Sequence, residues 1–166
     1  MSPLQLSPLR FSPEEVTEVV GLYMSNPEYC RATGEYDPER VPADRVEADL
    51  REEAETEGCE VLLAREGQDR IVGLVCLLDR HPTDGHPWIG LLLVHGSLRR
   101  HGVGRRLAGL MEERFRREGR EGIRLAVLEN NPAALAFWRS LGWQEIDRRP
   151  DRRHQRPCIV MHKQLV

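Results

Sequence analysis

The sequence predicts a mixed α/β fold, organised as one domain over residues 1–166. Three observations predict it. Strand-like runs alternate with runs of helical period, in the order β-α-α-β-β-β-α-β-α-β-β. The run WIGLLLV (88–94) is apolar throughout, which is typical of a strand covered on both faces. A chain of 166 residues that is 40% hydrophobic and 31% charged is long enough to enclose a core and ordinary for a globular domain.

The first elements are read from local signals. Residues 3–10 alternate weakly and predict a strand. The stretch SPEE supplies Ser12 as N-cap, Pro13 at the first helical position and Glu15 to complete a capping box. The helix that follows is expected to bury Val16, Val19, Val20 and Tyr23, and to end near SNPEY.

Residues 25–42 contain three prolines with Asn26 and Gly34, and they predict a substantial loop. A second, acidic helix is expected from Ala43 to about Glu57, ending at Gly58.

The central region predicts a hairpin followed by a strand and a helix. Residues 59–79 form two β-rich runs around a Gly67–Asp69 turn. A turn at 83–87 precedes the strand 88–94. From Gly104 the period becomes helical, and the helix is expected to end at Gly119. The apolar stripe of this helix is Leu107, Leu110, Met111 and Phe115.

The C-terminal third predicts a strand over 123–128, a short helix and two closing strands. Asn131 is the expected helix cap with Pro132 at the first position, and Gly142 ends the helix. Its stripe is Ala134, Phe137, Trp138 and Leu141. WQEI and CIVMHKQL are read as strands around the basic turn DRRPDRRHQR.

Composition and charge exclude several classes. A net charge of −3 gives no global attraction to nucleic acid or anionic membrane. No apolar run approaches the roughly 18 residues of a membrane helix, and no signal peptide is seen, so a cytoplasmic protein is expected. The four cysteines form no CxxC pair, which favours buried free thiols over a disulfide framework or a metal site.

The stretch VHGSLRRHGVGRRL (94–107) crowds Arg99, Arg100, Arg105 and Arg106 around two glycines where a strand gives way to a helix. Glycines let the backbone approach a ligand, and the free N–H groups of a first helical turn bind anions. A solvated basic loop is the alternative. A P-loop would need Lys after the second glycine, and a Rossmann turn would need a third glycine where Leu107 stands. A pyrophosphate held by another fold is therefore favoured.

Two motifs together resemble the GCN5-related N-acetyltransferase (GNAT) superfamily. The turn is similar to that family's acetyl-CoA signature, Q/R-x-x-G-x-G/A after an apolar strand. NPAALAFWRSLGW (131–143) is similar to its N-x-x-A-x-x-hydrophobic-Tyr-x-x-x-G-F/W segment. The resemblance implies a mixed, mostly antiparallel sheet in which a parallel strand pair splays apart, flanked by about four helices.

The resemblance also implies how acetyl-CoA would be held. The backbone of Leu92, Leu93 and Val94 would pair with the pantetheine arm like an added strand, and an N–H of this stretch would stabilise the oxyanion. Asn131 would contact the arm, for which the alternative is only a helix cap, and Trp138 would line the acetyl or pantetheine pocket or pack in the core. The pyrophosphate would be held by Arg99, Arg100, His101, Gly102, Val103 and Gly104.

The sequence departs from the family at the catalytic groups. Trp138 stands where the family has its acidic tyrosine, and an indole N–H is no practical acid. The positions where relatives carry a basic carboxylate align with Trp88 and Ala126. Glu129, after the second strand of the pair, is the weak catalytic candidate that remains. Further candidates, His81 and His86 before the motif strand and Tyr29 and Tyr36 in the 25–42 loop, are more simply exposed or structural residues.

The function expected from the resemblance is acetyl-CoA-dependent N-acetylation of a primary amine, most simply of a small molecule, without a metal. A catalytically weak or inactive CoA-binding regulatory module, and a protein or peptide N-acetyltransferase, are the alternatives. The acidic second helix could attract a polycation, although a solvated helix face is the simpler interpretation. The family also suggests a homodimer as a possible assembly.

Overall fold

A seven-stranded sheet forms the centre of the molecule, whose computed structural model describes residues 2–166. The spatial order is β1-β2-β3-β4-β5-β7-β6, and only β4 and β5 run parallel. This confirms the predicted mixed, mostly antiparallel sheet with one parallel pair. The strands are β1 (Leu4–Pro8), β2 (Cys59–Glu66), β3 (Arg70–Leu78), β4 (Trp88–Val94), β5 (Gly122–Leu128), β6 (Gln144–Pro150) and β7 (Pro157–Gln164).

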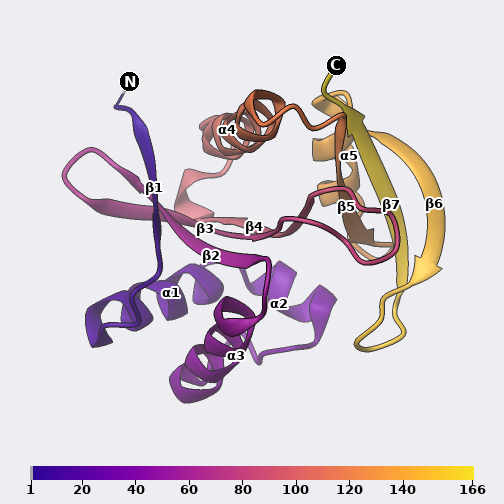
Figure 1. Ribbon diagram of the computed structural model, residues 1–166. Helices are drawn as coiled ribbons and strands as arrows, with labels where there is room; N and C mark the ends of the chain where they lie inside the picture. Colours follow the sequence, from indigo (N-terminus) through magenta and orange to yellow (C-terminus); the bar gives the residue numbers. More distant parts are fainter. Residues whose placement is uncertain (1) are drawn as a thin grey trace.

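Helices cover both faces of the sheet (Figure 1). One face carries α4 and α5, and the opposite face carries α1, α2 and α3. Five α-helices are therefore present in the described part of the chain, against the roughly four expected. They are α1 (Pro13–Met24), α2 (Pro27–Thr33), α3 (Ala43–Glu55), α4 (Val103–Arg117) and α5 (Pro132–Ser140), and a short 3₁₀ turn (Gly96–Leu98) precedes α4.

The first helix begins as predicted. Ser12 accepts a hydrogen bond from the Glu15 amide at 3.2 Å, and Pro13 occupies the first turn. The Glu15 carboxylate reaches back to the Arg10 amide at 2.6 Å rather than to the N-cap amide. The buried face contains Leu22 instead of Val20, which is half-buried, because the helix packs one position further round than the stripe indicates.

The loop predicted for residues 25–42 is wrong in its first half, where α2 lies. Its signals are those of any helix: Pro27 is at the first position, and Gly34 ends the helix with φ +69°. Asn26 precedes Pro27 but does not cap the helix with its side chain, whose oxygen accepts from Arg99 instead. The three prolines of residues 25–42 favoured the prediction of a loop, and the helix of seven residues was therefore missed.

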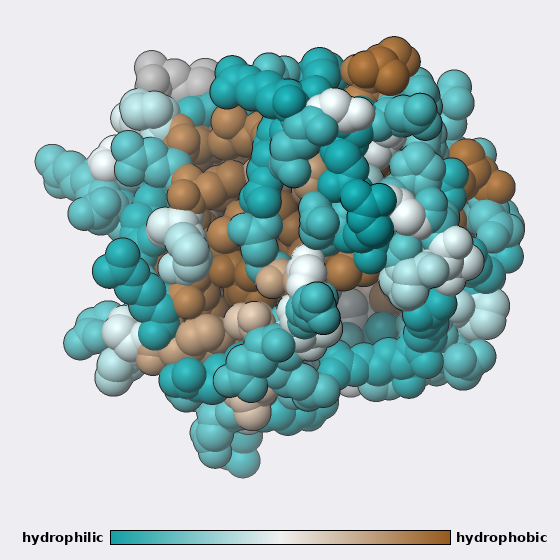
Figure 2. Space-filling view, viewed as in Figure 1, coloured by the Kyte–Doolittle hydropathy of each residue, from teal (hydrophilic) through white to brown (hydrophobic). Residues whose placement is uncertain are grey.

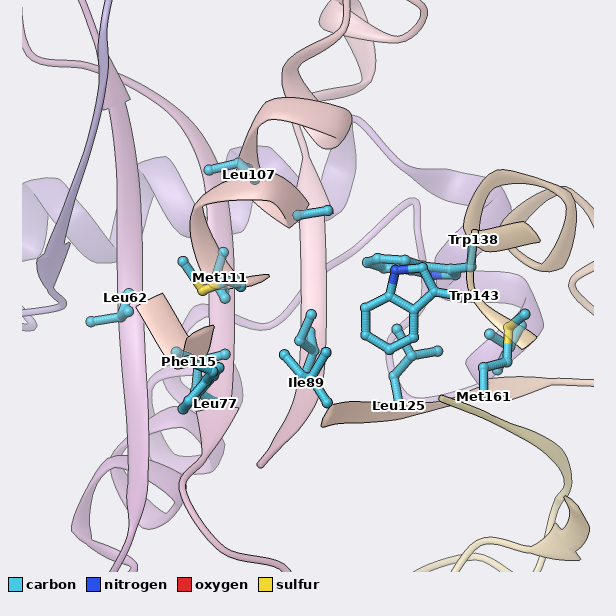
Figure 3. Packing of buried hydrophobic residues seen from close by; sticks show 14 of the residues in the cluster. Leu62, Leu77, Ile89, Leu107, Met111, Phe115, Leu125, Trp138, Trp143 and Met161 are labelled. Atoms are coloured by element: carbon cyan, nitrogen blue, oxygen red, sulfur yellow. The ribbon is translucent and has the colours of Figure 1, made fainter. Parts of the chain in front are cut away.

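The core on the α4 side contains the largest apolar cluster (Figure 3). Leu107, Met111 and Phe115 of α4 are at most 1% exposed and lie over β2 and β3, as the periodicity predicts. Leu110 is 39% exposed, so its predicted place in the stripe is wrong, and Ala108 takes the buried position. Truncating a side chain as buried as Phe115 to alanine typically costs about 3–5 kcal/mol.

The indoles of Trp138 and Trp143 fill the same core beneath α5, on the other side of Ile89 from α4 (Figure 3). Their rings meet edge to face with centroids 5.1 Å apart. The buried indole nitrogen of Trp143 has no hydrogen-bond partner among the described residues and is turned toward the Trp138 ring, which can accept a weak N–H···π contact.

The first of the two closing strands is longer than predicted, and the second has its predicted length. β6 continues through Pro150, so much of the basic stretch read as a turn is an edge strand, and the turn itself is confined to residues 151–156. The sequence does not indicate this strand, because all but one of the β6 residues are exposed and the apolar–polar alternation of a half-buried strand is missing.

Most of the face in Figure 2 is hydrophilic, and apolar residues show through mainly between α4 above and α1 below, where β1 and β2 lie. Cys30, Cys76 and Cys158 are buried and Cys59 is half-buried. Within residues 2–166, no helix is both long and apolar enough to cross a bilayer.

Candidate functional site

The parallel strands β4 and β5 separate shortly after they begin. They pair only at Trp88–Arg124 and Ile89–Leu125, yet β4 continues to Val94 and β5 to Leu128. A cavity of about 310 Å³ lies in the resulting gap, lined by both strands. This volume is at the lower end of typical small-molecule sites.

A β-bulge in β4 controls which backbone groups face this gap. The register with β3 shifts between Cys76 and Leu77, so that Gly90 is the extra residue of β4. Beyond the bulge, His95 donates its N–H to Val72 on β3 at 2.9 Å. Successive residues of a strand direct their polar groups to opposite edges. Leu93 therefore addresses β3, whereas Leu92 and Val94 address the gap.

The predicted anion site lies at the start of α4, directly after β4. Gly102 is the N-cap with φ +81°, a conformation that favours glycine, and it offers no side chain to cap the helix. The first-turn amides of α4 are thus left for a ligand, with the positive end of the helix dipole behind them. The Val103 side chain is buried, so only its backbone can take part. Arg100 and His101 are exposed beside this turn.

The arginines of the turn have different surroundings. Arg99 donates to Asn26 Oδ1 at 3.2 Å and lies 3.4 Å from Glu28. Arg106 instead pairs with Glu66 on β2 at 2.7 Å, so it is not among the residues that surround the α4 N-terminus.

The second glycine of the turn serves packing. A Cβ at Gly104 would lie 3.1 Å from the Phe137 ring and 3.8 Å from Val94 Cγ2. The first turn of α4 therefore sits against both the end of β4 and the helix α5. Three residues of the α5 segment line the cavity, Asn131, Ala134 and Trp138. Asn131 also caps α5 through its side chain, which accepts from the Ala134 amide at 3.2 Å.

The corner between α1 and α2 holds the β4–α4 connection in place. Asn26 is 5% exposed, and its side-chain amide donates to the Val94 carbonyl at 2.9 Å. Ser25 Oγ accepts from the Gly96 amide at 2.9 Å. Arg99 is bound to the same corner, so the position of the basic turn depends on a segment about 70 residues away in sequence.

The far wall of the cavity comes from α2 and from the β6–β7 turn, and sequence reasoning missed most of it. Thr33, Glu35, Asp151 and Arg156 all line the cavity. Arg156 joins the two segments, because it pairs with Asp151 at 2.7 Å and with Glu35 at 3.6 Å and donates to the Thr33 carbonyl at 2.6 Å. No local pattern brings Arg156 to Thr33, so only the order of the strands could have indicated this wall.

The two candidate tyrosines have different surroundings. Tyr29 lines the cavity, and burial, with Glu35 next, raises its pKa, so its hydroxyl stays protonated and can donate. Tyr36 is buried and donates its hydroxyl to Asp49 at 2.6 Å.

Glu129 is exposed at the end of β5 and pairs with Arg148 at 3.4 Å. It is not among the residues that line the cavity. Its catalytic role stays a prediction. The interaction that the structure does show for Glu129 is the ion pair with Arg148.

The histidines of the loop before β4 pack against other side chains and are absent from the cavity lining. The His81 ring stacks on Trp88 with centroids 4.5 Å apart, and the His86 ring meets His162 edge to face at 5.4 Å. Arg124 donates to His162 Nδ1 at 3.1 Å. Protonation of His81 or His86 would place a cation near the Arg124 guanidinium.

Burial lowers the pKa of His81 and, together with Arg124, the pKa of His86 below the ordinary 6.5. A lowered pKa in the folded state means that the unfolded chain binds more protons in acid, so this stability is present above pH 6.5 and is lost as pH falls below it. We therefore expect the melting temperature to drop between pH 7 and pH 5. His86→Gln should flatten this dependence in thermal melts, and substitution of the exposed His154 should not; equal slopes for all three proteins would contradict it.

Comparison with known proteins supports the resemblance seen in the motifs. Residues 16–143 match the sequence profile of the acetyltransferase (GNAT) family. No significant match is found among curated proteins.

Solved structures share the fold over nearly the whole chain. An acetyltransferase from Thermus thermophilus matches with a TM-score of 0.76 and 21% identity, covering 99% of this chain and 99% of that one. Spermidine N-acetyltransferase from Vibrio cholerae, solved with CoA and spermine, matches with a TM-score of 0.73 and 16% identity over 98% and 95% of the two chains. A GCN5-related N-acetyltransferase from Kribbella flavida gives 0.66 and 21% over 97% of both. Since the family profile covers most of the sequence, the chain belongs to the acetyltransferase (GNAT) family.

Proposed function

We propose that this protein transfers an acetyl group from acetyl-CoA to a primary amine of a small molecule, by direct attack of the amine on the thioester. The observation that carries the proposal is the gap between β4 and β5, whose cavity is lined by β4, the strand that leads through the basic turn into the uncapped N-terminus of α4. The residues present fit a CoA molecule, because a strand edge, a pocket and an anion site follow one another along the chain.

The CoA side of the proposal rests mainly on backbone groups. The amide of Leu92 and the polar groups of Val94 face the gap and would pair with the pantetheine arm. The Val94 carbonyl already accepts from Asn26, so its N–H is the group left for the ligand. The turn from Arg99 to Gly104 would hold the pyrophosphate.

The acceptor side is proposed to be the wall formed by α2 and the β6–β7 turn. Its polar groups include the Tyr29 hydroxyl and the carboxylates of Glu35 and Asp151, which suit an amine more than an anion. The Vibrio cholerae relative was solved with spermine, which supports a small amine as acceptor only loosely. Arg156 neutralises part of this charge.

The protonated Tyr29 hydroxyl is the donor that we assign to the leaving sulfur, since Trp138 lacks an acidic proton. Glu129 would act only if it left Arg148. A cytoplasmic location and a homodimer stay predictions from the sequence.

Calorimetry and a thiol-release assay test the proposed function together. We expect acetyl-CoA to bind with a Kd between about 1 μM and 1 mM, the span in which enzyme KM values usually fall, and free thiol to appear with at least one amine of a panel. The panel contains spermidine, an aminoglycoside, a lysine peptide and a peptide with a free N-terminus.

Each outcome separates the alternatives. Turnover of spermidine or the aminoglycoside supports a small-molecule enzyme, and turnover of the peptides alone would indicate a protein or peptide N-acetyltransferase. Binding of acetyl-CoA without turnover of any acceptor would indicate a CoA-binding regulatory module. Absence of binding to folded protein would overturn the assignment of the site.

A further inference from the structure

The helix α3 carries a carboxylate on the face that packs against the sheet. Val46 and Leu50 are 1% and 5% exposed, and Glu53 continues their stripe at the helical spacing i, i+4, i+7. Glu53 is half-buried, whereas the other acidic residues of the last turn of α3, Glu52 and Glu55, are exposed. A glutamate on the inner face of an amphipathic helix is uncommon unless it has a partner or a task.

Glu53 lies over the bulge of β4. Its Oε1 is 3.7 Å from the place that a Cβ at Gly90 would occupy, and Gly90 itself lines the cavity between β4 and β5. The extra residue of the bulge makes Gly90 and Leu91 address the same face of the sheet, which is the α3 face. Glu53 is not itself among the residues that line the cavity, and because residue 90 is a glycine, no side chain at that position separates the carboxylate from it.

The carboxylate of Glu53 has no ion-pair partner in the described part of the chain, since Arg153 lies 3.8 Å from Glu52 instead. Burial raises its pKa, Arg153 opposes this, and the charges of Glu35 and Glu52 add to it.

The uncharged titratable groups near Glu53 are two thiols. Cys59 on β2 and Cys76 on β3 both sense its charge, and burial raises the pKa of each thiol, so both stay neutral. The nearby cation is Arg153, and the nearby anions are Glu35 and Glu52. Glu53 is thus a desolvated carboxylate without a fixed counter-charge, beside the place where the amine must lose a proton.

We propose that Glu53 binds the ammonium group of the acceptor beside Gly90 and removes its proton. This inference rests on the proposed function and supplies the base that is missing at Trp88 and Ala126. The carboxylate reaches the site from α3 instead of from either parallel strand.

Protons and bonds balance over the whole transfer. The ammonium group gives one proton to the Glu53 carboxylate, and the neutral nitrogen forms a C–N bond to the thioester carbon while the C–S bond breaks. The nitrogen then sheds a second proton, and the sulfur takes up one proton to leave as the CoA thiol. Glu53 returns its proton to water, so one proton is released for each amide formed.

Glu53→Gln tests the proposal with an acceptor that the wild-type protein acetylates. For a basic amine at pH 7 we expect kcat/KM to fall by about 100-fold or more, since general-base catalysis typically contributes about 10²–10⁴-fold. The wild-type kcat/KM should be level between the pKa of the carboxyl and that of the amine. In the variant it should rise about tenfold per pH unit toward the amine's pKa of about 10.4, because only the free amine reacts.

A weakly basic acceptor, such as trifluoroethylamine, is mostly neutral at pH 7, so the variant should lose much less activity with it. The matched control is Glu52→Gln, which removes the same charge one residue away and should keep the wild-type profile. Acetyl-CoA affinity should be the same in all three proteins. An equal loss with both kinds of amine, or an unchanged profile in Glu53→Gln, would overturn the role of Glu53, whereas a wild-type protein that acetylates no amine would overturn the proposed function itself.

Discussion

Gly102→Glu is expected to abolish measurable CoA binding while the protein stays folded. A side chain at residue 102 meets no atom within 4 Å, so nothing in the fold obstructs it. It places a carboxylate at the first-turn amides of α4, where the pyrophosphate would lie, and it competes for them as well as repelling the ligand. Two lost charge-assisted hydrogen bonds, at about 1.5–3 kcal/mol each, weaken binding by roughly 100-fold or more, because 1.4 kcal/mol is tenfold.

The φ of +81° at Gly102 makes any other residue there strained, so part of the effect could be structural. That strain is about 1–2 kcal/mol for an ordinary residue, which predicts a melting temperature lower by a few degrees. Gly102→Asn separates strain from charge, because asparagine tolerates positive φ and adds no charge.

Gly109→Glu is the matched charge control. Gly109 lies on the same helix with no atom within 4 Å of its missing side chain, about 10 Å further along the axis. At that distance, which exceeds the screening length of about 8 Å in physiological salt, the added charge should leave CoA affinity nearly unchanged. Calorimetric titration of the three variants measures the prediction, and wild-type affinity in Gly102→Glu would refute the anion site.

Gly96→Ala is expected to cause the largest loss of stability of any single methyl addition to the chain's glycines. Its Cβ would lie 1.9 Å from the Ser25 carbonyl oxygen and 2.9 Å from the carbonyl carbon, both of them backbone atoms that cannot rotate away. Relief requires the α1–α2 corner to separate from the β4–α4 connection, which breaks the bond from Gly96 to Ser25 Oγ and strains that from Asn26 to Val94. Overpacking, one broken hydrogen bond and one strained hydrogen bond together cost on the order of 4 kcal/mol.

A loss of that size lowers the melting temperature by on the order of 10 °C in a chain of this length. Gly21→Ala is the control, because it adds the same methyl group to α1 near the same corner, where no atom lies within 4 Å. It should leave the melting temperature unchanged or raise it, since alanine favours a helix more than glycine does. If Gly96→Ala melted with the wild-type protein, the close contact between the two segments would be wrong.

Local signals identified the beginnings of helices reliably. Ser12 with Pro13, and Asn131 with Pro132, each precede a helix that starts where the sequence predicts it. A cap acts through hydrogen bonds that span three residues, so the sequence alone contains everything the cap needs.

The same signals in Asn26 and Pro27 were outweighed by neighbouring prolines, and α2 was missed. The helix has only seven residues, too few for a periodic stripe, and its single buried residue is Cys30. Packing of Cys30 into the core beneath β3 and β4 stabilises it, and that contribution is not visible along the chain.

The turn after β4 was predicted to bind an anion because a glycine that can adopt positive φ and a free helix N-terminus are both local properties; the structure places Gly102 there with φ +81°, and anion binding stays a prediction. The sequence did not indicate which of the arginines lie beside this turn. Arg99 and Arg106 look alike in the sequence, but Asn26 holds one beside the turn and Glu66 draws the other to β2.

By itself the sequence determined the order of the elements apart from α2, the family and the position of the turn that follows β4, since each depends on residues a few places apart. The tertiary structure alone decided the rest: the gap between β4 and β5, the wall that Arg156 builds from α2 and the β6–β7 turn, and the approach of Glu53 to Gly90. These features join segments tens of residues apart, and their geometry follows from the packing of the whole sheet and its helices, which no local propensity encodes.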